Sequence, residues 1–319
     1  MPNQHPSLLW KGRKFGVEME FNKTNRDGHM ISGEHINTLL TDACEFGVTG
    51  TGRNYMSTSR GSKWEVMYDG TAGAGGGTGW EVSSPALELD EAGESDELRR
   101  GCDTLLRDLA PKISSNCGLH VHVDVSDFDW KEVQKLLGLW VRYEPFFFSM
   151  VPNSRAHNTY CRPMRAATWD EAYRVDQHQG YAAATALNAT TRRQFEDACR
   201  GLGKFKTLRM DMWMTNGRVE FRMHSSTITY TKIREWVRLL LSLVGRVKTS
   251  TLRTTSRLPV RVRALSRPTG FGPSYVLGAI GMGPMAADNA VNAATREVFD
   301  RLMQWIPERQ RKFSRGRRN

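Results

Sequence analysis

The sequence predicts an α+β protein, because strand patterns and helix patterns both occur along the chain. Residues 14–21 and 118–124 alternate polar and apolar side chains with the period of two that is typical of a strand with one buried face. Residues 95–109, 130–150 and 231–247 instead place apolar side chains at helical spacing and begin at capping residues. A chain of 319 residues can bury a substantial core, as one large domain or two small ones.

The strand predicted at 118–124 carries the side chains with the most specific chemistry. His120, His122 and Asp124 alternate with Leu and Val, so they are expected on one face, about 7 Å apart along the strand. Two imidazoles and a carboxylate in a row suit a metal or phosphate site. The alternative is a half-exposed strand whose histidines only form hydrogen bonds, and this stretch by itself leaves both interpretations open.

The strand predicted at 14–21 adds two carboxylates. Its aromatic and aliphatic residues point to one face, and Glu18 and Glu20 point to the other. Two carboxylates on a strand that is otherwise suited to burial are costly unless cations compensate them, and a divalent metal is such a cation. An edge strand with a wet polar face is the alternative.

Two further strands, at 64–69 and 80–84, contribute more acidic groups. Glu65 and Asp69 share one face of the first strand, and Glu81 lies in the second. Residues 70–79 between them are interpreted as a flexible hairpin loop, because they lack the lysine and the spacing of phosphate-binding glycine motifs and lead into a strand.

A hairpin with a tight turn is predicted near the end of this part of the chain. Residues 206–213 and 218–224 have strand patterns and flank Asn-Gly at 216–217, which is a strong signal for a two-residue turn. In the second strand Glu220 and Arg222 share a face, so they could bind a metal and a phosphate on the same side of one site. An ordinary ion pair within the strand is the alternative.

The excess of basic residues lies in the C-terminal region. Residues 246–319 contain 15 Lys+Arg and 4 Asp+Glu, and the 45 Lys+Arg and 34 Asp+Glu of the whole chain therefore leave 30 of each sign before them. Such a region could bind a polyanion such as nucleic acid, or form a solvated tail. The loop at 155–163, with Arg155 and Arg162, is either an anion-binding loop or a surface connection.

Cysteine usage and hydropathy exclude other classes of protein. The five cysteines are scattered without a Cys-x-x-Cys pair, so neither a disulfide framework nor a thiolate zinc site is predicted, and any metal should be held by oxygen and imidazole. The longest apolar runs, at 146–148 and 239–241, are too short to cross a membrane, and residues 1–16 lack the apolar segment of a secretion signal. We therefore expect a cytoplasmic protein without a membrane partner.

Six motifs in order resemble the amidoligase family of carboxylate–amine ligases, a superfamily that includes glutamine synthetase and glutamate–cysteine ligase. They are FGVEMEF at 15–21, YDGT at 68–71, WEVSSP at 80–85, CGLHVHVD at 117–124, YCRP at 160–163 and RVEFRMHSST at 218–227. The resemblance extends over roughly residues 13–247. It implies an ATP-dependent ligase with a glutamine-synthetase-like curved, mainly antiparallel sheet, with helices on the convex face and metals and ATP in the concave face.

The resemblance also implies a set of metal ligands. Glu18, His120 and Glu220 would hold the ion that contacts the transferred γ-phosphate of ATP. Glu20 and Glu81 would hold a second ion, and both ions would be Mg²⁺ or Mn²⁺.

Further roles are implied for residues that contact substrate. Arg222 and Arg162 would bind phosphate or an acyl-phosphate, and His122 would be a further phosphate-binding residue or a hydrogen-bond partner of the metal ligands. Asp69 would complete the second metal site or accept a proton from the amine, and the motifs leave both roles open. These are the groups that amide formation through an acyl-phosphate needs, because phosphorylation by ATP turns the oxygen of a carboxylate into a leaving group.

The chain departs from the family pattern in two places. The family prefers Asp-Gly-Ser where this chain has Asp-Gly-Thr at 69–71, and a glycine-rich segment follows, which concerns the shape of the substrate entrance. Nothing in the family corresponds to the chain after about residue 250. We therefore expect a catalytic domain at 1–250 and a basic extension at 251–319, with a helix near 293–305 and a disordered tail at about 307–319.

Two other functions compete with the ligase. The stretch His-Val-His-Val-Asp resembles the His-x-His-x-Asp-His of metallo-β-lactamase-type hydrolases, but Val125 stands where that family has a further histidine. The other is a non-catalytic protein that binds nucleic acid or another polyanion through the basic C-terminal region. For a ligase, the substrates would be a small-molecule, peptide or nucleotide carboxylate and an amine, and a glutamine amidotransferase could be a separate partner that supplies ammonia.

Overall fold

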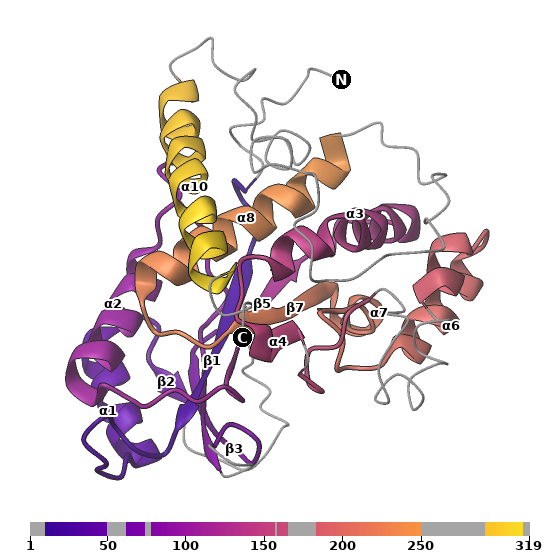
Figure 1. Ribbon diagram of the computed structural model, residues 1–319. Coiled ribbons are helices and arrows are strands. Elements are labelled where there is room, and N and C mark those ends of the chain that lie inside the picture. Colours follow the sequence, from indigo (N-terminus) through magenta and orange to yellow (C-terminus); the bar gives the residue numbers. More distant parts are fainter. Residues whose placement is uncertain are drawn as a thin grey trace. The chain divides into compact units, whose positions relative to one another are not determined.

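The computed structural model describes residues 10–49, 62–73, 78–156, 158–164, 183–249 and 291–314 (Figure 1). The chain forms two compact units. The strand-rich unit consists of Lys11–Val123 and His224–Arg238. The helix-rich unit consists of Met1–Trp10, Asp124–Met223 and Leu239–Asn319. The predicted α+β class is confirmed, whereas the predicted division of the chain at residue 250 stays a prediction.

The strand-rich unit is built on five strands in the order β2-β3-β4-β1-β5. All neighbouring pairs are antiparallel except β2 and β3, which are parallel. The bounds are Phe15–Asn22 for β1, Val48–Thr49 for β2, Trp64–Asp69 for β3, Gly79–Ser83 for β4 and Gly118–Asp124 for β5. Four of these strands lie where period-two alternation predicts them, because one face of each must be buried.

The apolar face of these strands packs against α2, Asp96–Thr104. Met19 of β1 and Cys102 of α2 are both fully buried, and their sulfur atoms are 4.0 Å apart. A Cβ atom on Gly101 would lie 2.5 Å from the ring of Trp64, so only glycine lets the helix approach β3 this closely. The indole Nε1 of Trp64 donates a 2.8 Å hydrogen bond to Glu97, which satisfies its polar edge within the core.

Two other helical segments complete this part of the unit. Helix α1, Gly33–Ala43, contacts α2 and β3, and its N-cap Ser32 accepts a hydrogen bond from the backbone N–H of His35. The π-helical turn η3, Leu105–Leu109, continues α2 and ends at Ala110 in the left-handed conformation. The remaining face of the sheet is left for the polar residues described below.

A buried ion-pair network joins the two chain segments of the strand-rich unit. Glu94 accepts hydrogen bonds from Tyr230 at 2.7 Å, Arg234 at 2.6 Å and Arg238 at 3.1 Å. Arg238 is fully buried and also donates to the carbonyl of Gly93 at 2.8 Å. Burial raises the pKa of Glu94, but the hydrogen bonds from Tyr230 and Arg234 and the charges of both arginines outweigh it and leave the pKa below its ordinary value.

Replacement of Glu94 by Gln is expected to lower the free energy of unfolding by about 3 kcal/mol, because Arg238 would lose a charged partner in a buried position. The stabilisation is complete above the pKa of the unfolded carboxyl group and is lost as the pH falls through the lower folded value. Urea denaturation at neutral pH and at roughly pH 3 checks both statements, because the wild type and the variant should converge in acid. Exposed Glu88 provides the control, and a Glu94→Gln protein as stable as Glu88→Gln at neutral pH would contradict the prediction.

The helix-rich unit contains most of the remaining elements. Their bounds are Trp130–Phe148 for α3, Asn153–Ala156 for α4, Arg192–Leu202 for α6, Leu208–Arg209 for β6, Met212–Asn216 for α7, Arg218–Ser225 for β7 and Val291–Ser314 for α10. Helix α8, Tyr230–Thr249, and strand β7 each run from one unit into the other. Helix α3 begins at a capping box: the side chain of Asp129 accepts a hydrogen bond from the backbone N–H of Glu132, and the side chain of Glu132 accepts one from the backbone N–H of Asp129.

The tight hairpin predicted at Asn216-Gly217 is wrong. Strand β6 has only two residues, which pair antiparallel with β7, and helix α7 fills the connection between them. Gly217 ends α7 in the left-handed conformation, with φ of 66°, and its backbone N–H donates to the carbonyl of Trp213. An Asn-Gly pair fits a helix C-terminus as well as a two-residue turn, because both need a residue with positive φ.

The predicted C-terminal helix is longer than expected. Helix α10 ends at Ser314 instead of near residue 305, and it contains Pro307. Its last turns are anchored in the unit, because Ile306 is fully buried and Arg309 donates to the carbonyl of Met150 at 3.2 Å. The tail predicted to be disordered from about residue 307 is therefore helical as far as Ser314. Residues 315–319 and the basic segment 250–290 lie outside the described residues.

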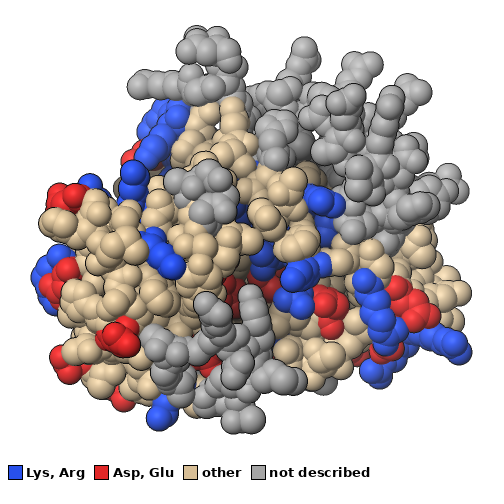
Figure 2. All heavy atoms as spheres, turned by 90° about the horizontal axis from the view of Figure 1, so that it is seen from below, with Lys and Arg blue, Asp and Glu red and all other residues tan. Residues whose placement is uncertain are grey.

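Charges of both signs are mixed on the part of the surface that the structure describes. On the face in Figure 2 basic and acidic side chains lie next to one another. On α6, for example, Arg192 pairs with Glu196 at 2.6 Å and Arg200 pairs with Asp197 at 2.7 Å. Among the described residues, no helix combines the length and the hydropathy that spanning a membrane requires.

Candidate active site

The strand register gives the strand-rich unit one polar face. Glu18 of β1 is the cross-strand partner of Ser83 on β4 and of His120 on β5. Glu20 is the partner of Glu81 on β4. Residues directly opposite each other on antiparallel strands point to the same side of a sheet, so these five side chains share the face opposite the apolar core.

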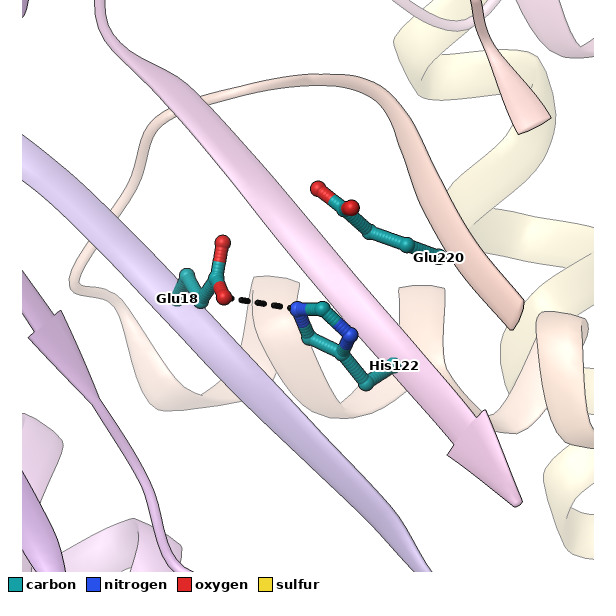
Figure 3. A group of neighbouring side chains, drawn as sticks. All are labelled: Glu18, His122 and Glu220. Atoms are coloured by element: carbon teal, nitrogen blue, oxygen red, sulfur yellow. Dashed lines mark hydrogen bonds and ion pairs between the residues drawn. The ribbon is translucent and has the colours of Figure 1, made fainter. Parts of the chain in front are cut away.

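Glu18 is held between two histidines. Its Oε1 lies 2.7 Å from Nε2 of His122, and its Oε2 lies 3.0 Å from Nδ1 of His120. The contact with His122 is the dashed line in Figure 3. Burial raises the pKa of Glu18, but the charge of His122 and the hydrogen bonds of both histidines outweigh it and hold the pKa well below its ordinary value. The carboxylate is therefore ionised over the neutral range, which is the state that a metal ligand needs.

Glu20 is fixed by contacts of its own. It is 6% exposed, and its Oε2 accepts a 2.6 Å hydrogen bond from the backbone N–H of Gly118, where β5 begins. Its Oε1 lies 3.4 Å from Nε2 of His120. The hydroxyl group of Ser226 donates to its main-chain carbonyl. One oxygen of Glu20 therefore anchors the start of β5, and the other points towards the histidine.

Within the described residues of the strand-rich unit, two groups of side chains could each hold a metal ion. Glu18, Glu81 and His120 offer ligand atoms that all lie within 4.8 Å of one another, and so do Glu20, Asp69 and Glu81. The first group offers two carboxylates and an imidazole nitrogen, and the second offers three carboxylates. Both sets of ligands are suited to Mg²⁺ and Mn²⁺. Glu81 belongs to both, and a shared carboxylate is the arrangement expected where two ions lie close together.

Asp69 has one oxygen engaged in a turn. Its Oδ1 accepts hydrogen bonds from the backbone N–H of Thr71 at 2.6 Å and from the hydroxyl group of Thr71 at 2.8 Å. Threonine thus supplies here the hydroxyl group that serine would supply in the family pattern. Asp69 also belongs to a ligand group with Glu20 and Glu81, and the two roles implied for it, metal ligand and proton acceptor, both stay predictions.

Glu65 and Ser83 were not predicted as site residues, although they lie on the same polar face. Glu65 of β3 is the cross-strand partner of Ser83. Glu65 is 7% exposed, and within the described chain neither its Oε1 nor the Oγ of Ser83 has a hydrogen-bond partner. The sequence places Glu65 and Asp69 on one face of a strand, but the burial of Glu65 without a partner depends on tertiary structure.

Glu220 and Arg222 lie on β7 in the helix-rich unit. Glu220 is 1% exposed, and its carboxylate pairs with Arg222 and, at 3.3 Å, with Arg209 of β6. Arg209 also pairs with Asp211 at 2.8 Å. Sequence reasoning did not identify Arg209 as a site residue. It could have been found from its position in the strand that pairs with the Glu-x-Arg motif. The ion pair between Glu220 and Arg222 was foreseen as the alternative to a metal site, and both descriptions remain compatible with this geometry.

Arg162 is positioned by its backbone. Its N–H donates to the carbonyl of Phe205 and its carbonyl accepts from the N–H of Thr207, each at 2.8 Å. The segment is held in turn by Glu144, which is fully buried and accepts hydrogen bonds from the hydroxyl group of Thr207 and, at 2.8 Å, from the N–H of Met164. Arg162 therefore lies in an extended segment whose backbone is hydrogen-bonded to a neighbouring segment. The interpretation of this stretch as a plain surface connection does not fit these contacts.

The structure brings together the predicted residues within each unit. In the strand-rich unit the polar face carries Glu18, Glu20, Asp69, Glu81, His120 and His122. In the helix-rich unit Glu220 pairs with Arg222 and Arg162 lies in the neighbouring extended segment. Asp124, which alternates with the histidines, instead accepts a 2.9 Å hydrogen bond from the N–H of Ser126 at the end of β5.

Comparison with known proteins identifies the family. A family model described as "Putative amidoligase enzyme" matches residues 11–244, which include every predicted site residue. No curated protein matches the chain. The matched region covers well over half of the chain, and membership indicates an enzyme of the ligase type. The chain belongs to the amidoligase family.

Proposed function

We propose that this protein is an ATP-dependent carboxylate–amine ligase, which forms an amide or peptide-like bond through an acyl-phosphate. The observation that carries the proposal is the pair of ligand groups that share Glu81 on the polar face of the strand-rich unit. Ligases of this kind must neutralise the phosphates of ATP, and two adjacent sites for divalent cations suit that task. Family membership supports the same reaction class.

The metal ligands on the polar face form two sets. Glu18, Glu81 and His120 would hold one Mg²⁺ or Mn²⁺ ion, and Glu20, Asp69 and Glu81 would hold the other. When bound, these ions would neutralise the phosphates of ATP and stabilise the charge that develops on the transferred group. In this arrangement Glu18 is kept ionised by its two histidines.

The helix-rich unit would contribute anion recognition. The assignment of Glu220 as a further metal ligand, and of Arg222 and Arg162 as phosphate-binding residues, rests on the resemblance of their motifs to those of the superfamily. A guanidinium group suits this role because its planar donors match the oxygens of a phosphoryl group. His122, whose Nε2 contacts Glu18, would orient that ligand. The glutamine-synthetase-like curvature of the sheet is part of the same proposal.

The reaction follows from the chemistry of these groups. A carboxylate of the substrate attacks the γ-phosphorus of ATP, and ADP leaves. The amine then attacks the acyl carbon, the C–N bond forms, and inorganic phosphate leaves with the electrons of the C–O bond. A carboxylate on the polar face accepts the proton of the ammonium group, because only the neutral amine has a free electron pair. Ammonia from a glutamine amidotransferase partner would be one source of the amine.

The test is binding followed by turnover. Mg²⁺ together with a non-hydrolysable ATP analogue is expected to raise the unfolding midpoint of the protein, because a ligand that binds only the folded state stabilises it. Libraries of carboxylates and amines, scored by ADP release, would then identify the substrates. A midpoint unaffected by Mg²⁺ and nucleotide, with no ADP release, would exclude the ligase. The polyanion-binding alternative stays a prediction, since much of the basic region lies outside the described residues.

A further inference from the structure

Glu65 and Ser83 form a pair of polar side chains that the roles above do not use. They are cross-strand partners on β3 and β4, on the face that carries the metal-ligand groups. Glu65 is 7% exposed, and its Oε1 has no hydrogen-bond donor in the described part of the chain. The Oγ of Ser83 is equally buried and has no partner there.

Among the described residues no donor reaches the Oε1 of Glu65, and a buried carboxylate oxygen in that state is costly to the fold, so packing alone does not account for Glu65. The adjacent core positions of β3 are filled by Trp64 and Val66, which are fully buried. The indole of Trp64 donates to Glu97 and not to Glu65. What the pair lacks among the described residues is therefore a group that carries positive charge and N–H donors.

The register places this pair one strand away from a metal-ligand group. Ser83 is the cross-strand partner of both Glu65 and Glu18, and neighbouring strands are about 4.8 Å apart. Glu18 belongs to the ligand group with Glu81 and His120. A cation held between Glu65 and Ser83 would therefore lie about one strand spacing from the ligand group that contains Glu18. From there an amine could reach the carbonyl carbon of a substrate bound at the metal ions.

We infer that Glu65 and Ser83 form the subsite for the ammonium group of the amine substrate. The inference rests on the proposed ligase function and deepens it. The carboxylate of Glu65 accepts one N–H of the ammonium group and balances its charge, and the Oγ of Ser83 accepts another. The class of substrate is ammonia or an unhindered primary amine, because a quaternary or heavily branched amine lacks the N–H donors or the small size that this pair requires.

The test measures binding of methylammonium chloride to the full chain. The unfolding midpoint is recorded against methylammonium concentration, with Mg²⁺ and a non-hydrolysable ATP analogue present and with sodium chloride balancing the ionic strength. Tetramethylammonium chloride, which has no N–H donor, is the ligand control. The variants are Glu65→Gln and Ser83→Ala, and Glu88→Gln is the matched control because Glu88 is an exposed carboxylate of the same unit.

Methylammonium is expected to raise the wild-type midpoint saturably, and tetramethylammonium is not. Glu65→Gln should weaken the apparent affinity by about 10- to 100-fold, as loss of a charge-assisted hydrogen bond predicts, and Ser83→Ala should weaken it less. Glu88→Gln should behave as the wild type does. An equal methylammonium response of Glu65→Gln and wild type, or a wild type that does not respond, overturns the inference.

The same titrations separate this inference from the proposed function. If Glu65→Gln keeps the stabilisation by Mg²⁺ and nucleotide but loses that by methylammonium, both stand. If Mg²⁺ and nucleotide leave every variant unchanged while methylammonium binding depends on Glu65, the ligase proposal falls and the cation subsite stands. If Mg²⁺ and nucleotide stabilise every variant and methylammonium stabilises none, the subsite falls alone.

Discussion

Glu18→Gln is expected to lower amine-dependent ADP release by about 10³-fold, which is the largest effect that we predict for a single carboxylate. Glu18 contacts both His120 and His122 and belongs to the ligand group with Glu81 and His120. An amide of the same shape keeps a hydrogen-bonding side chain but removes the negative charge that a divalent cation requires. Steady-state kinetics at saturating Mg²⁺ and ATP measure the loss.

The stabilisation of the protein by Mg²⁺ and an ATP analogue should fall in the same variant. Glu88→Gln, which changes an exposed carboxylate of the same unit, is the control and should leave both measurements unchanged. A Glu18→Gln protein that still responds to Mg²⁺ and nucleotide as the wild type does would remove Glu18 from the metal site. The histidines would then form only a hydrogen-bonded row.

Arg222→Lys is expected to lower ADP release by about 10²- to 10³-fold while the protein remains folded. The guanidinium group of Arg222 pairs with Glu220, and its Nε lies 3.4 Å from the carbonyl of Tyr160, which it reaches as a donor. Lysine keeps the charge and the pairing with Glu220 but loses the planar set of donors that fits a phosphoryl group. The measurement is ADP release, together with the unfolding midpoint without ligand.

Arg192→Lys is the matched control, because Arg192 is an exposed arginine of the same unit that pairs with a glutamate. The two midpoints should agree with that of the wild type within a few degrees, since each variant retains its ion pair. Full ADP release by Arg222→Lys would show that the arginine serves only the ion pair with Glu220. Loss of folding in Arg222→Lys would contradict the expectation that the substituted lysine keeps the ion pair with Glu220.

Local patterns were sufficient to locate strands β1, β3, β4, β5 and β7, but not the short strand β2 or the bounds of the short strand β6. Strand β5 has the predicted bounds, and β1 differs by one residue at each end. The reason is that an alternating sequence with one apolar face can bury that face only as a strand, so the pattern also determines which residues share a face. This is why Glu18 and Glu20, or His120 and His122, could be paired on one side before any neighbour was known.

The same patterns gave a wrong prediction where two different local structures meet the same requirement on the backbone. Gly217 was assigned to a two-residue turn because it follows Asn216, and it instead ends helix α7. Both outcomes use a positive φ, so the choice depends on contacts made elsewhere. A Cβ atom on Gly217 would lie 2.7 Å from the Cβ of Ser126, a residue far away in the sequence. The end of α10 was misjudged for a similar reason, since burial of Ile306 extends the helix past Pro307.

Sequence patterns alone were enough to identify the family, the strands that carry the candidate site and the residue types that could bind metal. Two features depend on tertiary structure: Glu81 belongs to two ligand groups, and the Oε1 of Glu65 is buried with no hydrogen-bond partner among the described residues. Both facts depend on which strands are neighbours and in what register they pair, and this pairing joins residues that are far apart in the chain. Periodicity within one strand carries no information about such pairs, because it is set by the local backbone, whereas register is set by the packing of the whole sheet.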